Sequence, residues 1–212
     1  MGDRRPEAGG LELMGAVMGN WRRARSMTMA LTMALGMAAL LALAPAAATA
    51  DQKSPGLDRL FERLKDAKNR SEADTAENAI WALWTHFGDK DVDTAMALGI
   101  AAMHSRDLQN ALAFFNHVIK VAPNFAEGWN KRATAHYLMG DYDASVADIR
   151  RTLALEPRHF GALSGMGLIY DAIDKPAAAV KVWKRALEIH PHMRGIRQRM
   201  KDLDARAKGN PT

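Results

Sequence analysis

The sequence predicts an all-α fold, a solenoid in which pairs of antiparallel helices stack one upon another. The first observation is a repeat of 34 residues, marked by Pro123, Pro157 and Pro191. A fixed period of this size is typical of stacked supersecondary units rather than of one closed core. Three further sets of residues keep the same step: Phe115, Ile149 and Trp183; Gly99, Ala133 and Gly167; and Ala111, Ser145 and Ala179.

Periodicity and composition are the second and third observations. Apolar residues recur at helical spacing, and no stretch alternates apolar and polar residues as a half-buried strand does. Apolar residues make up 48% of the 212 residues and charged residues 25%, as in globular proteins. Cysteine is absent, which excludes disulfides, thiol nucleophiles and thiolate metal sites.

The first 50 residues have the pattern of a secretory signal peptide with an extended N-region. A basic cluster at 21–25 precedes an apolar run at 27–43, and small residues end the segment as Ala48-x-Ala50. We expect cleavage after Ala50 and a periplasmic or secreted protein. An uncleaved membrane anchor is the alternative, because the 17 apolar residues are close to the minimum that spans a bilayer.

Residues 51–56 read as a linker, and residues 57–91 as a first helical pair that lacks most markers of the repeat. The run Ser71-Glu72-Ala73-Asp74 resembles a capping box that opens the second helix. A solenoid needs an atypical unit at its end, because a terminal unit has only one neighbour. We therefore expect this degenerate pair to be the N-terminal end unit.

Three regular units follow at residues 92–125, 126–159 and 160–193, and a proline ends the second helix of each. Residues 194–208 then form one more amphipathic helix, which is expected to cap the open end of the stack, before a frayed tail at 209–212. The six helices of the three units are expected near 92–104 and 108–121, 126–139 and 142–155, and 160–173 and 176–189.

These units resemble the tetratricopeptide repeat, a helix–turn–helix unit of 34 residues. The third unit carries the resemblance most clearly, with Gly167, Tyr170, Ala179, Trp183 and Pro191. The resemblance implies a right-handed superhelical solenoid, and with the signal pattern of residues 1–50 we expect a member of the exported bacterial type. It also implies a concave groove, lined by the first helices of the units, that takes an extended peptide or a partner's helix.

The second unit departs from the family pattern. Arg132 and His136 stand where leucine and tyrosine are usual, so we expect looser inner packing in this unit. In all three units the small residues are expected to lie where two helices approach closely, and a large side chain such as Trp183 to fill the next layer.

Helical spacing then gives the residues of the groove. Gly161, Ser164 and Gly165 are small and would leave room beside Tyr137 for a bulky side chain of a ligand. The alternative is that the apolar members merely pack against the neighbouring unit. The expected peptide-binding residues are Met96, Ile100, Met103, Glu127, Asn130, Lys131, Thr134, Tyr137, Ser164 and Leu168, with Arg158 and His159 at the edge.

A sharper ligand prediction can be tested on the same positions. Chaperone-binding members of the family carry a carboxylate clamp of Lys, Asn and Arg side chains. The matching places here hold Met96, Ile100, Gly161 and Gly165, and Lys131 is the one polar residue among them. A chaperone's C-terminal tail is therefore not the expected ligand.

No motif for catalysis, a cofactor or a metal ion stands out in the sequence. The seven histidines form neither an HExxH motif nor a pair at i and i+4, and His190-Pro191-His192 places its two rings at a helix end. There is no GxSxG and no phosphate-binding loop. We expect no enzymatic activity, no cofactor and no metal site.

Charge leaves a second class of function open. The net charge is +5, and residues 1–50 hold five basic and three acidic residues, which leaves 24 basic and 21 acidic residues for the rest. We expect this mild excess to be spread over the helical faces. The alternatives to a scaffold are self-assembly through the open end, or a nucleic-acid or anionic-surface binder that uses Arg150, Arg151, Arg194, Arg197, Arg199 and Lys201.

The leading prediction is a non-catalytic scaffold or adaptor in the bacterial periplasm or cell envelope. Its expected partner is a protein or peptide held in the groove. Nucleic acid is not expected, because an exported protein rarely meets it and because Asp202 and Asp204 dilute the basic helix. The membrane would be a partner only through an uncleaved signal sequence.

Overall fold

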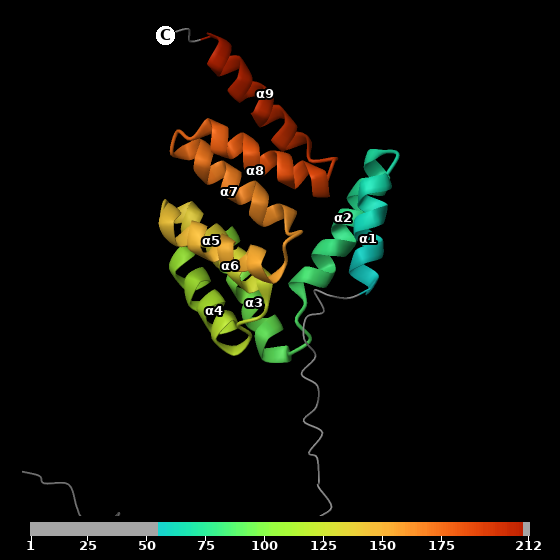
Figure 1. The fold of residues 1–212 in the computed structure, drawn as a ribbon. Coiled ribbons are helices and arrows are strands. Elements are labelled where there is room, and N and C mark those ends of the chain that lie inside the picture. Colours follow the sequence, from blue (N-terminus) through green and yellow to red (C-terminus); the bar gives the residue numbers. More distant parts are fainter. Residues whose placement is uncertain (1–54, 210–212) are drawn as a thin grey trace, which may run out of the picture. The chain divides into compact units, whose positions relative to one another are not determined.

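The computed structural model describes residues 55–209, and within them it contains nine α-helices and no strand (Figure 1). The all-α prediction is confirmed. The predicted signal peptide lies outside the described residues, and so do residues 210–212. The helices are α1 (Pro55–Asp66), α2 (Arg70–Thr85), α3 (Lys90–His104), α4 (Leu108–Val121), α5 (Ala126–Met139), α6 (Tyr142–Leu155), α7 (Phe160–Ala172), α8 (Pro176–Ile189) and α9 (Arg194–Gly209).

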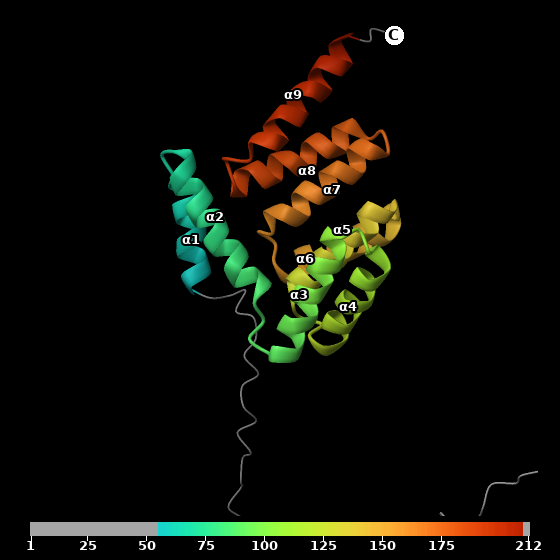
Figure 2. The ribbon, with the colours of Figure 1, turned by 180° about the vertical axis from the view of Figure 1, so that it is seen from behind.

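The helix bounds follow the repeat closely. Four of the six helices in the regular units have the predicted bounds, while α3 begins two residues early at Lys90 and α7 ends one residue early at Ala172. The helices pack as the antiparallel pairs α3–α4, α5–α6 and α7–α8, and the two views show these pairs in successive layers (Figures 1 and 2). The linker predicted at 51–56 overlaps α1, which begins at Pro55.

Aspartates at equivalent turns begin the second helices of the first two units. The side chain of Asp107 accepts a hydrogen bond from the backbone of Asn110, and that of Asp141 accepts one from Ala144. One cap differs from the prediction: Asn69, not Ser71, caps α2 by accepting from the backbone of Glu72. The Glu72 carboxylate accepts in turn from the backbone of Lys68 and from the side-chain amide of Asn69, so a variant of the capping box lies two residues earlier than expected.

Small residues lie against large ones at the predicted places. A Cβ atom added to Gly99 would lie 2.5 Å from Phe115, and one added to Gly167 would overlap the indole of Trp183. Both aromatic side chains are fully buried. The 34-residue period therefore reflects a close contact between the two helices of a unit, which recurs in the first and third units.

A salt bridge replaces the apolar contact that the second unit lacks. The guanidinium of Arg132 donates from Nε and Nη2 to the two carboxylate oxygens of Asp148, over 2.8 and 2.7 Å. It also donates to Asn116 over 2.7 Å. Because Asp148 is almost fully buried, this bidentate pair holds α5 against α6 in place of the usual leucine.

The α1–α2 hairpin packs against the third unit, which is distant in the sequence. Leu57, Phe61 and Leu64 of α1 join Trp84 of α2 and Phe160 of α7 in one buried cluster. Ile189 and Met193 pack against the same cluster. The sequence pattern predicted an end unit but gave no sign that the hairpin reaches past its nearest neighbour.

The last helix covers the apolar face of the third unit. Ile196 and Leu203 of α9 are buried together with Ala179 and Trp183 of α8. Figure 1 shows α9 following α8 at the C-terminal end of the stack. Within residues 55–209, none of the helices has the length and apolar character needed to cross a membrane.

Candidate functional site

The predicted groove residues fall into three groups in the structure. Met96 is buried in the core of the first unit, and Ile100 and Met103 pack against that core. Thr134 donates to the Asn130 carbonyl of its own helix, and Tyr137 packs against Tyr142. The remaining residues lie near the α1–α2 hairpin: Glu127, Asn130, Lys131 and His159 form a network under α2, Arg158 lies against α1, and Ser164 and Leu168 line a pocket beside α2.

The network under α2 is built around the buried carboxylate of Glu127. Lys131 Nζ lies 3.0 Å from one oxygen, while Asn130 Nδ2 donates to the other over 3.0 Å. His159 Nδ1 accepts from the backbone of Ala162, so its Nε2 carries the proton and donates to Glu127 over 2.8 Å. Burial raises the pKa of Glu127, but Lys131 and His159 outweigh it and hold that pKa below its usual value.

Helix α2 covers this network with two tryptophans. The indole of Trp84 stacks on the His159 ring, with 4.1 Å between the ring centroids and 11° between the planes. Lys131 Nζ lies 5.3 Å from the centroid of the Trp81 ring, within cation–π range. Part of the predicted groove therefore already holds a helix of the same chain.

Gly161 gives Trp81 the space it occupies. A Cβ atom at this position would lie 2.7 Å from Cη2 of the indole. The sequence predicted that small residues of α7 would leave room beside Tyr137 for a bulky side chain of a ligand, whereas in the structure Trp81 of the same chain lies against Gly161. The predicted neighbour Tyr137 packs elsewhere, against Tyr142.

Two polar contacts fasten the hairpin at its two helices. Arg158 Nη1 donates to Asp58 of α1 over 2.6 Å, and its guanidinium lies 4.4 Å from the centroid of the Phe61 ring. His190 Nε2 lies 3.0 Å from Glu77 of α2. The hydrogen bond from His190 is the main cause that holds the pKa of Glu77 below its usual value.

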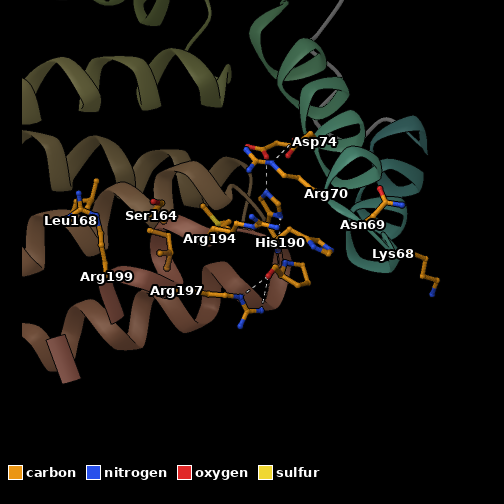
Figure 3. A pocket seen from close by; sticks show the side chains of 16 residues that line it. Lys68, Asn69, Arg70, Asp74, Ser164, Leu168, His190, Arg194, Arg197 and Arg199 are labelled. Atoms are coloured by element: carbon orange, nitrogen blue, oxygen red, sulfur yellow. Dashed lines mark hydrogen bonds and ion pairs between the residues drawn. The ribbon is translucent and has the colours of Figure 1, made fainter. Parts of the chain in front are cut away.

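A pocket of about 840 Å³ remains open beside α2. Figure 3 shows side chains of α2 on one side and those of α7 and the start of α9 on the other. Ser164 and Leu168 line it as part of the predicted groove. Sequence reasoning missed Lys68 and Arg70, because no pattern indicated that the α1–α2 turn would lie near α9.

The arrangement offers recognition by charge, hydrogen bonding and apolar contact. The polar groups around Glu127 hold one another, and the pocket beside them combines cationic and apolar side chains. Among residues 55–209 no group of three His, Cys, Asp or Glu side chains could hold a metal ion.

Among known proteins, this chain is similar to proteins built from helical repeats. No family model matches the chain. A TPR repeat-containing protein of Rhizobium etli is 35% identical over 156 residues, which cover 74% of this chain and 76% of that protein.

Two solved structures show the same helical-repeat fold. The TPR2B domain of yeast Sti1, in its pHsp70 complex, superposes with a TM-score of 0.52 at 21% identity and covers 56% of this chain and 99% of that one. The first TPR of Spaghetti (RPAP3), bound to the HSP90 peptide SRMEEVD, has a TM-score of 0.53 at 17% identity and covers 57% and 95%.

Proposed function

Because the chain belongs to the tetratricopeptide-repeat (TPR) protein family, we propose that it is a non-catalytic scaffold that binds a protein or peptide partner beside α2. The proposed location is the bacterial periplasm or cell envelope, on the strength of the signal-like residues 1–50. Peptide complexes of two structural neighbours, with pHsp70 and with the HSP90 peptide SRMEEVD, support a peptide as the class of partner.

The observation that carries the proposal is the open pocket next to an occupied groove. Trp81 and Trp84 show that the surface of α5 and α7 holds an amphipathic helix by its aromatic face. Ser164 and Leu168 continue the predicted groove into the pocket, where α2 leaves room for a second segment. A partner's segment can therefore lie along α7 and α9 while the hairpin stays in place.

Site-specific photo-crosslinking tests this function directly. A photoreactive amino acid replaces Leu168 in the pocket, or Lys184 on the exposed face of α8 as the control, in the full chain expressed in cells. We expect an adduct with one defined protein from position 168 and none from position 184. Adducts from Lys184 alone, or from neither position, would contradict binding in the pocket.

The proposed location has its own test. Protein isolated from the periplasmic fraction should begin at Asp51, as N-terminal sequencing would show. Protein found in the cytosolic fraction with residues before Asp51 still attached would contradict export.

A further inference from the structure

The excess of basic over acidic residues after residue 50 is concentrated in one pocket. The residues that line the pocket include five basic side chains and two acidic ones. After residue 50 the sequence has 24 basic and 21 acidic residues, so the pocket contains the whole excess and the remainder is balanced at 19 of each. This differs from the expected spread over the helical faces. The five basic residues are Lys68, Arg70, Arg194, Arg197 and Arg199.

The two acidic side chains of the pocket are already engaged. Asp74 pairs with Arg70 over 3.1 Å, and Glu77 accepts hydrogen bonds from His190 and from the Trp81 indole. Arg197 donates twice to the carbonyl of Pro191. These contacts leave the other three cations of the pocket without an internal anion.

Those three cations are the side chains of Lys68, Arg194 and Arg199. All three residues are exposed, and within residues 55–209 no carboxylate pairs with their side chains. Like charges that line one cavity repel one another and attract anions. Helix α9 also begins at Arg194, and the partial positive charge of its N-terminus adds to the same field.

The other residues that line the pocket favour a peptide over a nucleic acid as its ligand. Leu168, Pro191 and Met193 give the pocket apolar surface, which an aliphatic side chain can cover. No Phe, Tyr or Trp is among the lining residues, so the pocket lacks the stacking platforms typical of single-strand binders. The basic residues surround a cavity and do not form the extended stripe that follows a phosphate backbone.

We propose that the pocket binds an acidic, partly apolar segment of the partner protein. Carboxylates of the segment pair with Arg194, Arg199 and Lys68, and an aliphatic side chain lies against Leu168. The inference rests on the proposed scaffold function and gives the chemical class of its ligand. All three of these cations come from beyond the regular repeats, so the site depends on α9 and on the α1–α2 turn.

Fluorescence anisotropy with the full chain tests this class of ligand. The probe is a fluorescein-labelled octapeptide of alternating glutamate and leucine with an amidated C-terminus. An octapeptide of alternating lysine and leucine and an oligothymidylate of similar charge are the comparison ligands. The acidic peptide should bind, the basic peptide should not, and affinity should fall as sodium chloride is raised.

Matched charge reversals locate the site. The double variant Arg194→Glu/Arg199→Glu should weaken binding of the acidic peptide about tenfold or more. The variant Lys181→Glu/Lys184→Glu changes the net charge equally on the exposed face of α8 and should keep the wild-type affinity. Because Arg194 and Arg199 are exposed, both variants should retain the helical circular dichroism of the wild type, and Arg194→Gln/Arg199→Gln should give an intermediate loss.

Three results would overturn the proposal. They are no binding of the acidic peptide, an equal loss in both charge-reversal variants, and tighter binding of the oligothymidylate in competition with the peptide. If Leu168 still gives a crosslinked partner while the acidic peptide fails to bind, the scaffold function stands and the acidic class of ligand is wrong.

Discussion

At the scale of single residues, Glu127 decides how α5 and α7 are joined. Its carboxylate is almost entirely removed from solvent, which is costly for a charge unless nearby cations and hydrogen-bond donors compensate it. Lys131 and Asn130 come from its own helix, whereas His159 is the N-cap residue of α7. The charge of Glu127 therefore ties α5 to the start of α7.

Replacing Glu127 should lower stability in a pH-dependent way. Glu127→Gln removes the charge that Lys131 and His159 stabilise, and the free energy of unfolding at neutral pH should fall by about 2 kcal/mol. The folded-state pKa of Glu127 lies below the usual 4.5, so the wild type has this advantage above pH 4.5 and loses it as pH falls through the folded value.

Denaturant unfolding at a series of pH values checks this expectation. The exposed Glu62→Gln serves as the control and should stay close to the wild type at every pH. A difference between Glu127→Gln and the wild type that does not shrink in acid would contradict the assignment of the lowered pKa.

Two glycines of α7 should respond with opposite signs to the same substitution. Gly→Ala within a helix normally stabilises by up to about 1 kcal/mol. At Gly167 the added methyl group would overlap the buried Trp183, so we expect Gly167→Ala to destabilise by about 1–3 kcal/mol. At Gly165 the nearest atom is 3.7 Å away, and Gly165→Ala should be neutral or stabilising.

Thermal or denaturant unfolding of the two variants measures the contrast. Equal stability of Gly167→Ala and Gly165→Ala would contradict the close approach of α7 and α8. The repeat predicted this approach, because Gly167 and Trp183 keep the 34-residue step. It could not predict the network of Glu127, since hydrogen-bond partners on different helices leave no period in a sequence.

At the scale of helices, the α1–α2 hairpin is held mainly by its aromatic residues. Trp84 is buried between His159, Phe61 and Phe160. Trp84→Ala should therefore destabilise the protein by about 3–5 kcal/mol. The loss should concentrate in the hairpin, because the regular units have cores of their own.

Hydrogen exchange read out by mass spectrometry shows where the loss falls. Amides of α1 and α2 should exchange faster in Trp84→Ala, while those of α5–α8 keep most of their protection. Leu83→Ala, on the exposed side of α2, should leave the exchange pattern of the wild type. Uniformly faster exchange over α1–α8 in Trp84→Ala would contradict this prediction, because it would show that the hairpin and the regular units unfold together.

Helix positions were predictable, but the docking of this hairpin was not. Periodic apolar residues, aspartate caps and prolines set the bounds of α3–α8 within two residues. The period reports only contacts between neighbouring units. Asp58 and Arg158 are 100 residues apart, and neither belongs to a repeated position.

At the scale of the described helical unit, the hairpin and the third unit should behave as one body. Glu62 of α1 and Glu188 of α8 line a common pocket with Phe61 and Arg158. In this cysteine-free chain, Glu62→Cys/Glu188→Cys should be joined efficiently by a short bismaleimide. Mass spectrometry should detect the intramolecular link, and Glu62→Cys/Lys181→Cys should give little of it.

A link that fails to form between positions 62 and 188 would contradict the docked position of α1. Intermolecular products in place of the intramolecular one would indicate exchange of hairpins between copies. Mass spectrometry distinguishes the two kinds of crosslinked product, because a dimer joined between two copies has twice the mass of a monomer joined within itself.

The long reach of the α1–α2 hairpin also has a consequence for the order in which the helices can fold. Asp58 and Glu77 meet their partners 100 and 113 residues later in the chain. Helices α1 and α2 are thus synthesised long before His190. Their aromatic side chains stay exposed to solvent while the regular units form their local contacts. We therefore expect the helices that are synthesised first to dock last, so that the fold is completed only once His190 is available.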